Sequence, residues 1–167
     1  MAEDNKVKAY PIEKKGDSRQ VKFIRKYTTL FIKKRYKRAR IGYLINRLLY
    51  SCDIYPSVKI GKHFHLMHFG LGVVIHPYTV IGDDVWIYQN VTVGVKHHAD
   101  YFKFQIGNNV LIGAGAVILG KGEMSIGDNS IIAANSVVLN SVPANAVVAG
   151  NPAKIVKLDG NKVDINL

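Results

Sequence analysis

Residues 75–94 read IHPYTV-IGDDVW-IYQNVT-VG, with an aliphatic residue at every sixth position: Ile75, Ile81, Ile87 and Val93. The same six-residue period extends to both sides, through Ile54, Ile60, Leu66, Ile106, Ile112, Ile118, Ile126, Ile132 and Val138. This period is typical of a parallel β-helix, in which each coil buries its inner face against the next coil. We therefore predict an all-β solenoid of hexapeptide repeats.

The repeat array divides the chain into three parts. Residues 1–50 form a basic arm, and the spacing of its apolar residues predicts helices between residues 20 and 50. Residues 51–157 form the β-helix, and residues 158–167 form a C-terminal tail. The stretch 95–105 interrupts the period, which predicts a loop that leaves the solenoid.

The charge of the chain is concentrated in the basic arm. Residues 1–50 hold 15 Lys and Arg against 4 Asp and Glu, which accounts for the whole net charge of +11. Such asymmetry favours an interaction element. No nucleic-acid recognition motif accompanies it, so we expect no nucleic-acid partner. With one cysteine, no secretion signal pattern and only short apolar runs, we expect a cytoplasmic protein.

An acid–base pair stands at the start of the array, where Asp53 precedes His68 by fifteen residues. An imidazole can take the proton of a hydroxyl as that hydroxyl attacks a carbonyl carbon. A carboxylate on the other ring nitrogen fixes the tautomer and stabilises the imidazolium. The pair predicts general-base catalysis.

Five segments resemble the serine acetyltransferase group of hexapeptide-repeat acyltransferases. They are Asp53-Ile-Tyr-Pro-Ser-Val-Lys-Ile-Gly, His68-Phe-Gly-Leu-Gly-Val-Val-Ile, Gln89-Asn-Val-Thr-Val-Gly, Ile112-Gly-Ala-Gly-Ala-Val-Ile-Leu-Gly and Ala149-Gly-Asn-Pro-Ala-Lys-Ile-Val. The resemblance implies a left-handed β-helix and a homotrimer that binds acetyl-CoA between neighbouring chains. It also implies that His68 is the catalytic base and that Asp53 orients it.

The resemblance also suggests where acetyl-CoA would bind. Small residues at the coil turns would let the pantetheine arm lie close to the backbone: Gly113, Ala114, Ala133 and Ala134. Gly94 would lie near the thioester, and Lys154 could meet a phosphate of coenzyme A. His63, His65 and His68 could suit zinc, but the wider motif of metal-binding β-helices is missing, so we expect no metal.

Two departures from the serine enzymes guide the prediction of the acceptor. Met67 stands where those enzymes have an aspartate that helps to hold the amino acid, and a short basic arm replaces their long helical region. This combination resembles the shorter relatives that O-acetylate sugars in capsule, exopolysaccharide or lipopolysaccharide synthesis, whose acceptors are often lipid-linked at the inner face of the cell membrane. The resemblance implies an O-acetyltransferase acting on a saccharide hydroxyl, and we expect His97 and His98 near the acceptor. Residues 20–50 would then contact the membrane.

Two alternatives stay open. One is a serine acetyltransferase with an unusual acceptor pocket. The other is a β-helix scaffold that no longer turns over and docks through its basic arm.

Overall fold

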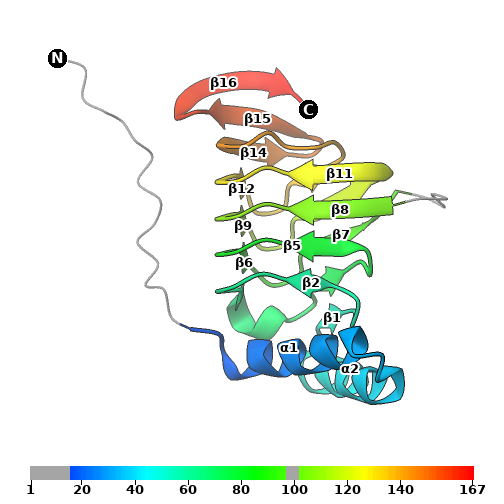
Figure 1. Cartoon of the computed structure of the whole chain (residues 1–167). Coiled ribbons are helices and arrows are strands. Elements are labelled where there is room, and N and C mark those ends of the chain that lie inside the picture. The colour runs from blue at the N-terminus through cyan, green and yellow to red at the C-terminus, as the bar shows by residue number, and fades with distance from the viewer. Residues whose placement is uncertain (1–15, 97–101) are drawn as a thin grey trace.

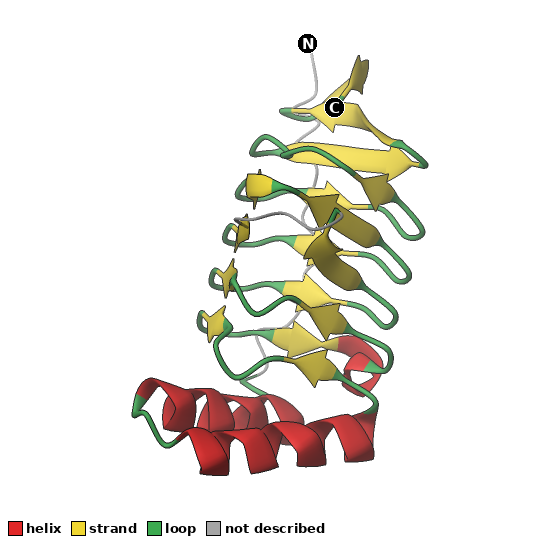
Figure 2. Ribbon diagram, turned by 90° about the vertical axis from the view of Figure 1, so that its right-hand side faces the viewer, coloured by secondary structure: helices red, strands yellow, loops and turns green. Residues whose placement is uncertain are grey.

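The six-residue period becomes a three-sided coil in the structure, a computed structural model that describes residues 16–96 and 102–167 (Figure 1). Each coil contributes short strands to three sheets, and strands of successive coils pair in parallel. The last two strands of the chain pair antiparallel at the end of the third sheet. The coils stack above a pair of helices that lie across one end of the stack (Figures 1 and 2). The predicted parallel β-helix is confirmed.

The strands fall into three sheets in a regular order. The first sheet holds β1 (Asp53–Ile54), β4 (Val74–Ile75), β7 (Thr92–Val95), β10 (Val117–Gly120) and β13 (Val137–Val138). The second holds β2 (Lys59–Ile60), β5 (Thr79–Ile81), β8 (Phe102–Ile106) and β11 (Gly122–Ile126). The third holds β3 (His65–Leu66), β6 (Trp86–Ile87), β9 (Leu111–Ile112), β12 (Ile131–Ile132), β14 (Ala146–Gly150), β15 (Ala153–Leu158) and β16 (Asn161–Asn166).

The periodic aliphatic residues form columns inside the coil stack. Strand register in the first sheet aligns Ile54, Ile75, Val93, Ile118 and Val138, all of them buried. Burying one such side chain stabilises the fold by about 1.5–3 kcal/mol, so each coil is held chiefly by its neighbours.

Asparagines turn the chain at one edge of the stack. Asn109, Asn129 and Asn145 each adopt a positive φ between 54° and 59°, which asparagine tolerates better than most residues. Their side chains form a ladder in which each amide donates to the next residue, at 2.9, 3.0 and 2.9 Å, ending on Asp159. The ladder satisfies the polar groups of these turns.

Strand β8 corrects the predicted loop 95–105. β7 runs to Val95 and β8 begins at Phe102, where Phe102, Phe104 and Ile106 point inward in alternation. Residues 102–106 interrupt the six-residue period because their inward side chains alternate with a period of two, as in an ordinary strand. His97 and His98 lie outside the described residues.

The helices of the arm are α1 (Arg19–Ile32) and α2 (Tyr36–Tyr50). Ser18 caps α1 by accepting a hydrogen bond from the Val21 amide at 3.2 Å. α1 buries Val21, Ile24 and Tyr27, and the Tyr27 hydroxyl donates to the Ile54 carbonyl at 2.8 Å. The predicted helices are confirmed, and α1 covers the open end of the first coil.

Candidate functional site

The turn that carries His68 has an unusual backbone. It is a short 3-10 helix, Met67–Gly70, in which His68, Phe69 and Gly70 all have a positive φ of 51°, 56° and 60°. A residue other than glycine in this region costs about 1–3 kcal/mol, and such strain clusters at functional sites. The His68 side chain is exposed, so the turn presents its imidazole to solvent.

Contacts with the preceding segment hold this turn in place. The Gly72 amide donates to the Ser51 carbonyl at 2.9 Å, and the Asp53 amide donates to the Val73 carbonyl at 2.7 Å. Gly70 packs on Cys52, because a Cβ at Gly70 would lie 3.0 Å from the Cys52 sulfur. Burial raises the pKa of the Cys52 thiol to about 12, so Cys52 is a packing residue rather than a thiolate nucleophile.

Asp53 lies beside the His68 turn and is held from the other side by α2. Tyr43 donates its hydroxyl to the Asp53 carboxylate at 2.7 Å, and Arg47 forms an ion pair with it at 3.5 Å. Among the described residues, no hydrogen bond or ion pair joins Asp53 to His68. The two predicted partners thus lie on neighbouring segments without a hydrogen bond or ion pair between them in the described part of the chain.

Tyr43 and Arg47 were missed by sequence reasoning. Their spacing of four residues puts both on one face of a helix, which was the available signal. Burial, together with the hydrogen bond and the charge of Asp53, raises the pKa of Tyr43 to about 12, against the opposing effect of Arg47. The phenol therefore stays neutral and remains a donor to Asp53 at ordinary pH.

Several predicted cofactor residues line up with His68. The segments that join the third sheet to the first form one edge of the stack, which we name the His68 corner: residues 67–73, 88–91, 113–116 and 133–136. Strand register places His68, Ala114 and Ala134 at equivalent positions of it, each two residues after an aligned strand residue. The structure therefore brings the predicted base and these small residues to one edge.

Not every small residue at this edge needs a ligand to explain it. A Cβ at Gly113 would lie 2.6 Å from the backbone nitrogen of Ala134, so the stacking of coils already requires glycine there. Ala133 is half-buried on the same turn. Gly94 lies in β7 opposite Leu119, where an added Cβ would be in ordinary contact at 3.4 Å. Gly94 is thus free of a packing constraint of this kind.

The remaining predicted residues lie as follows. Met67 is half-buried and directly precedes His68. Lys154, in β15, is exposed and pairs with Asp164 at 3.4 Å. An exposed pair of this kind is worth little, so the ammonium could exchange to a phosphate.

The other histidines near the first coil have partners of their own. His63 approaches Asp84 at 3.2 Å, and His65 stacks on Trp86 with ring centroids 3.9 Å apart. Burial lowers the pKa of His65. Across residues 16–96 and 102–167, no group of three or more His, Cys, Asp or Glu side chains could hold a metal ion.

Comparison with known proteins finds serine acetyltransferases. The sequence matches no established protein-family profile. It is 44% identical over 140 residues to a serine acetyltransferase of Staphylococcus xylosus, covering 80% of this chain and 61% of that protein. It is 46% identical over 140 residues to the serine acetyltransferase of Staphylococcus aureus strain Mu50, covering 80% and 62%. The chain thus spans about three fifths of the length of these relatives.

Solved structures that are similar to this chain include further serine acetyltransferases. The serine acetyltransferase of Brucella abortus strain S19 in complex with coenzyme A superposes with a TM-score of 0.78 at 35% identity, over 83% of this chain and 54% of that chain. Soybean serine acetyltransferase complexed with serine superposes with a TM-score of 0.74 at 34% identity, over 82% and 56%. The fold of this chain is therefore the β-helix of these serine acetyltransferase structures. Over the matched residues, the chain is similar to serine acetyltransferases.

These relatives correct the predicted acceptor. Proteins that are 44–46% identical over most of the chain are serine acetyltransferases, so the prediction of a saccharide acceptor is wrong and the serine alternative is favoured. The prediction relied on Met67 and on the short arm. One side chain and a short arm are weaker evidence about the acceptor than identity over 140 residues.

Proposed function

We propose that this protein transfers an acetyl group from acetyl-CoA to the hydroxyl of serine. The observation that carries this proposal is the identity of 44–46% with serine acetyltransferases over 140 residues. The exposed His68 on its strained turn supports it, because a general base must reach a substrate in solution.

His68 acts as the base in this reaction. It accepts the proton of the serine hydroxyl as the oxygen attacks the thioester carbonyl carbon. The carbon–sulfur bond then breaks, and the proton passes from His68 to the departing thiolate of coenzyme A. General-base help of this kind is worth about 10²–10⁴ in rate.

Asp53 orients His68 in this proposal. A carboxylate offers about four lone-pair sites, and the hydroxyl of Tyr43 and the guanidinium of Arg47 use only part of that capacity. A site remains for the imidazole N–H. Tyr43 and Arg47 are then positioning residues, since they act on His68 through Asp53.

Acetyl-CoA lies along the His68 corner in this proposal. A solved relative carries coenzyme A, which supports acetyl-CoA as the co-substrate. Ala114 and Ala134 share the corner with His68, and small side chains there leave the backbone open to a pantetheine arm. Gly94 and Lys154 complete the assignment, the first near the thioester and the second near a phosphate. Gly113 and Ala133 flank the same turns.

The acceptor end and the assembly are further parts of the proposal. Met67 lies next to His68, and we assign His97 and His98 to the acceptor side as well. The exposed apolar residues Leu71, Val74 and Tyr78 lie on or beside the second coil and would be covered in a homotrimer. Sedimentation equilibrium on the purified chain tests the trimer.

The test of the function measures thiol release from acetyl-CoA with L-serine as acceptor. We expect serine-dependent release that falls by about 10²–10⁴ in the His68→Ala variant. Met67→Asp restores an anionic partner for the serine ammonium and should lower the KM for serine by about thirtyfold, as expected for a charge partner worth about 2 kcal/mol.

The outcomes separate the alternatives. Serine-dependent release that persists unchanged in His68→Ala would remove His68 as the base. Release in Met67→Asp alone would keep acetyl transfer but remove serine as the native acceptor. No release in either protein, even at saturating serine, would overturn the proposal and leave the non-catalytic scaffold.

A further inference from the structure

Helix α2 has a second apolar face that nothing in the described chain covers. Its buried face, which includes Ala39 and Asn46, packs against α1 and the first coil. The opposite face is apolar as well and points outward: Ile41, Leu44, Ile45, Leu48 and Leu49. The exposed fraction reaches 85% at Leu48 and 66% at Leu49. An exposed apolar face opposite the buried one calls for a second partner.

Close packing of the two helices determines which residues of α2 face inward. The small Ala39 and Gly42 lie on its inner side. A Cβ at Gly42 would lie 2.7 Å from the Cβ of Tyr27, so the two helices approach too closely for larger residues there. The larger aliphatic side chains are left outside.

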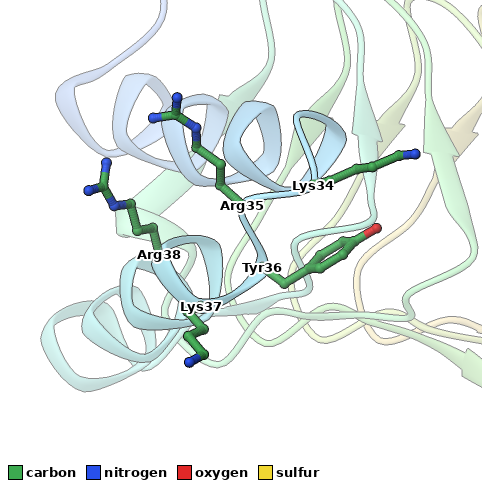
Figure 3. A pocket seen from close by; sticks show the side chains of 5 residues that line it. All are labelled: Lys34, Arg35, Tyr36, Lys37 and Arg38. Atoms are coloured by element: carbon green, nitrogen blue, oxygen red, sulfur yellow. The ribbon is translucent and has the colours of Figure 1, made fainter.

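Cations surround the N-terminal end of this apolar face. The corner between α1 and α2 forms a pocket of about 520 Å³ lined by Lys34, Arg35, Tyr36, Lys37 and Arg38. Figure 3 shows that the charged ends of these side chains spread in different directions rather than meeting at one point. No carboxylate of the described residues pairs with them. A spread of cations suits many separate anions better than a single small one.

We infer that the outer face of α2 docks on the surface of an anionic membrane. Such a surface offers apolar acyl chains to Leu48 and Leu49 and separate headgroup phosphates to the spread cations. The helices lie across one end of the coil stack, so the stack does not obstruct this face (Figures 1 and 2). No helix in the described part of the chain could span a bilayer, so this contact is peripheral.

A second copy of the chain fits the face less well. In a twofold contact the patch meets its own copy, so a surface that carries Lys37 and Arg38 would meet a surface of the same net positive charge. Like charges brought together in this way oppose association, whereas anionic headgroups neutralise them. This inference is independent of the proposed acetyl transfer, because it uses a different face of the molecule.

Vesicle sedimentation of the full chain tests the inference. We expect binding to vesicles that contain phosphatidylglycerol, weakened by salt, and little binding to pure phosphatidylcholine. Leu48→Asn should lower the partition coefficient by about tenfold or more, since it removes a buried leucine from the contact. Lys37→Gln and Arg38→Gln should each lower it by about fivefold.

Matched controls come from the opposite end of the stack. Ile165 is 44% exposed, and Lys162 is also exposed, both in β16. Ile165→Asn and Lys162→Gln should leave the partition coefficient unchanged. Because Leu48 is so exposed, Leu48→Asn should also keep the melting temperature of the parent, which removes misfolding as an explanation.

Three results would overturn the inference. The first is equal binding to neutral and anionic vesicles. The second is full vesicle binding by Leu48→Asn. The third is a lower sedimentation mass for Leu48→Asn in the absence of vesicles, which would show that a second copy covers this face.

Discussion

Replacing Tyr43 by Phe removes one hydrogen bond and leaves the ring in place. The Tyr43 hydroxyl donates to the Asp53 carboxylate at 2.7 Å, and a hydrogen bond to a charged group contributes about 1.5–3 kcal/mol. The side chain of Asp53 is 30% exposed, so water can replace part of the lost interaction. We therefore expect Tyr43→Phe to lower the free energy of unfolding by about 1.5 kcal/mol, at the low end of that range.

A double-mutant cycle in urea isolates this interaction. In the Asp53→Ala background the acceptor is absent, so Tyr43→Phe should cost less than about 0.5 kcal/mol, and the coupling energy should be about 1 kcal/mol. Protein concentration is held fixed, because association would shift the apparent stability. Tyr55→Phe is the matched control, since Tyr55 is a neighbouring tyrosine whose ring contacts Tyr43 with centroids 5.4 Å apart.

The cycle can refute the assigned role of Tyr43. A coupling energy within about 0.3 kcal/mol of zero would mean that the hydrogen bond contributes nothing to the fold. An equal loss of unfolding free energy in Tyr55→Phe would mean that the effect of Tyr43→Phe does not come from the hydrogen bond to Asp53. In the acetyl-transfer assay the same substitution should lower kcat with little change in KM, because Tyr43 acts through Asp53.

Two further perturbations test packing in the helical region and in the coil stack. The pKa values of Tyr43 and Cys52 are both raised to about 12, from ordinary values of 10.0 and 9.0. Both groups are therefore harder to ionise in the folded protein than in the unfolded chain. Their contribution to the free energy of unfolding is complete below about pH 9 and is lost as the pH rises toward 12. The urea midpoint should therefore fall between pH 9 and pH 11, and a flat profile would contradict the burial of these groups. Gly82→Ala would place a Cβ 2.6 Å from the Gly107 carbonyl oxygen and should cost about 1–3 kcal/mol in thermal or urea unfolding. Gly16→Ala, which meets no atom within 4 Å, should be nearly neutral, and equal effects would refute the stacking argument.

The sequence predicted those features that repeat. A period of six depends only on local strand and turn geometry, so the columns through Ile54 and Ile75 could be counted from the residues alone. The strand that begins at Phe102 could not be found in this way, because its inward residues alternate with period two. The same limit applies to α2, where Ala39 faces the core and Leu44 is exposed. An apolar period indicates a helix but does not say which of its faces is buried. Here the close approach of α1 at Gly42 determines which face is buried.

The site was predictable to the extent that it lies on the repeats. His68 and Ala114 fall at equivalent positions of successive turns, so the count along the chain already aligned them. The support of Asp53 by Tyr43 and Arg47 was not predictable, because it depends on how α2 lies against the first coil. Residues that support a side chain such as Asp53 from a different element leave little trace in a repeat pattern.

The two ends of the coil stack determine how the molecule can associate. A solenoid with bare ends offers unpaired strand edges to the next molecule, and repeated addition would give a filament. Here α1 and α2 close one end. At the other, β15 and β16 reverse direction and pair antiparallel to β14 and to each other, so that no further coil can add in register. The outermost strand also carries Lys162 and Asp164, charges that discourage pairing with a second edge. Both ends of the described coil stack are therefore closed to pairing with a further coil.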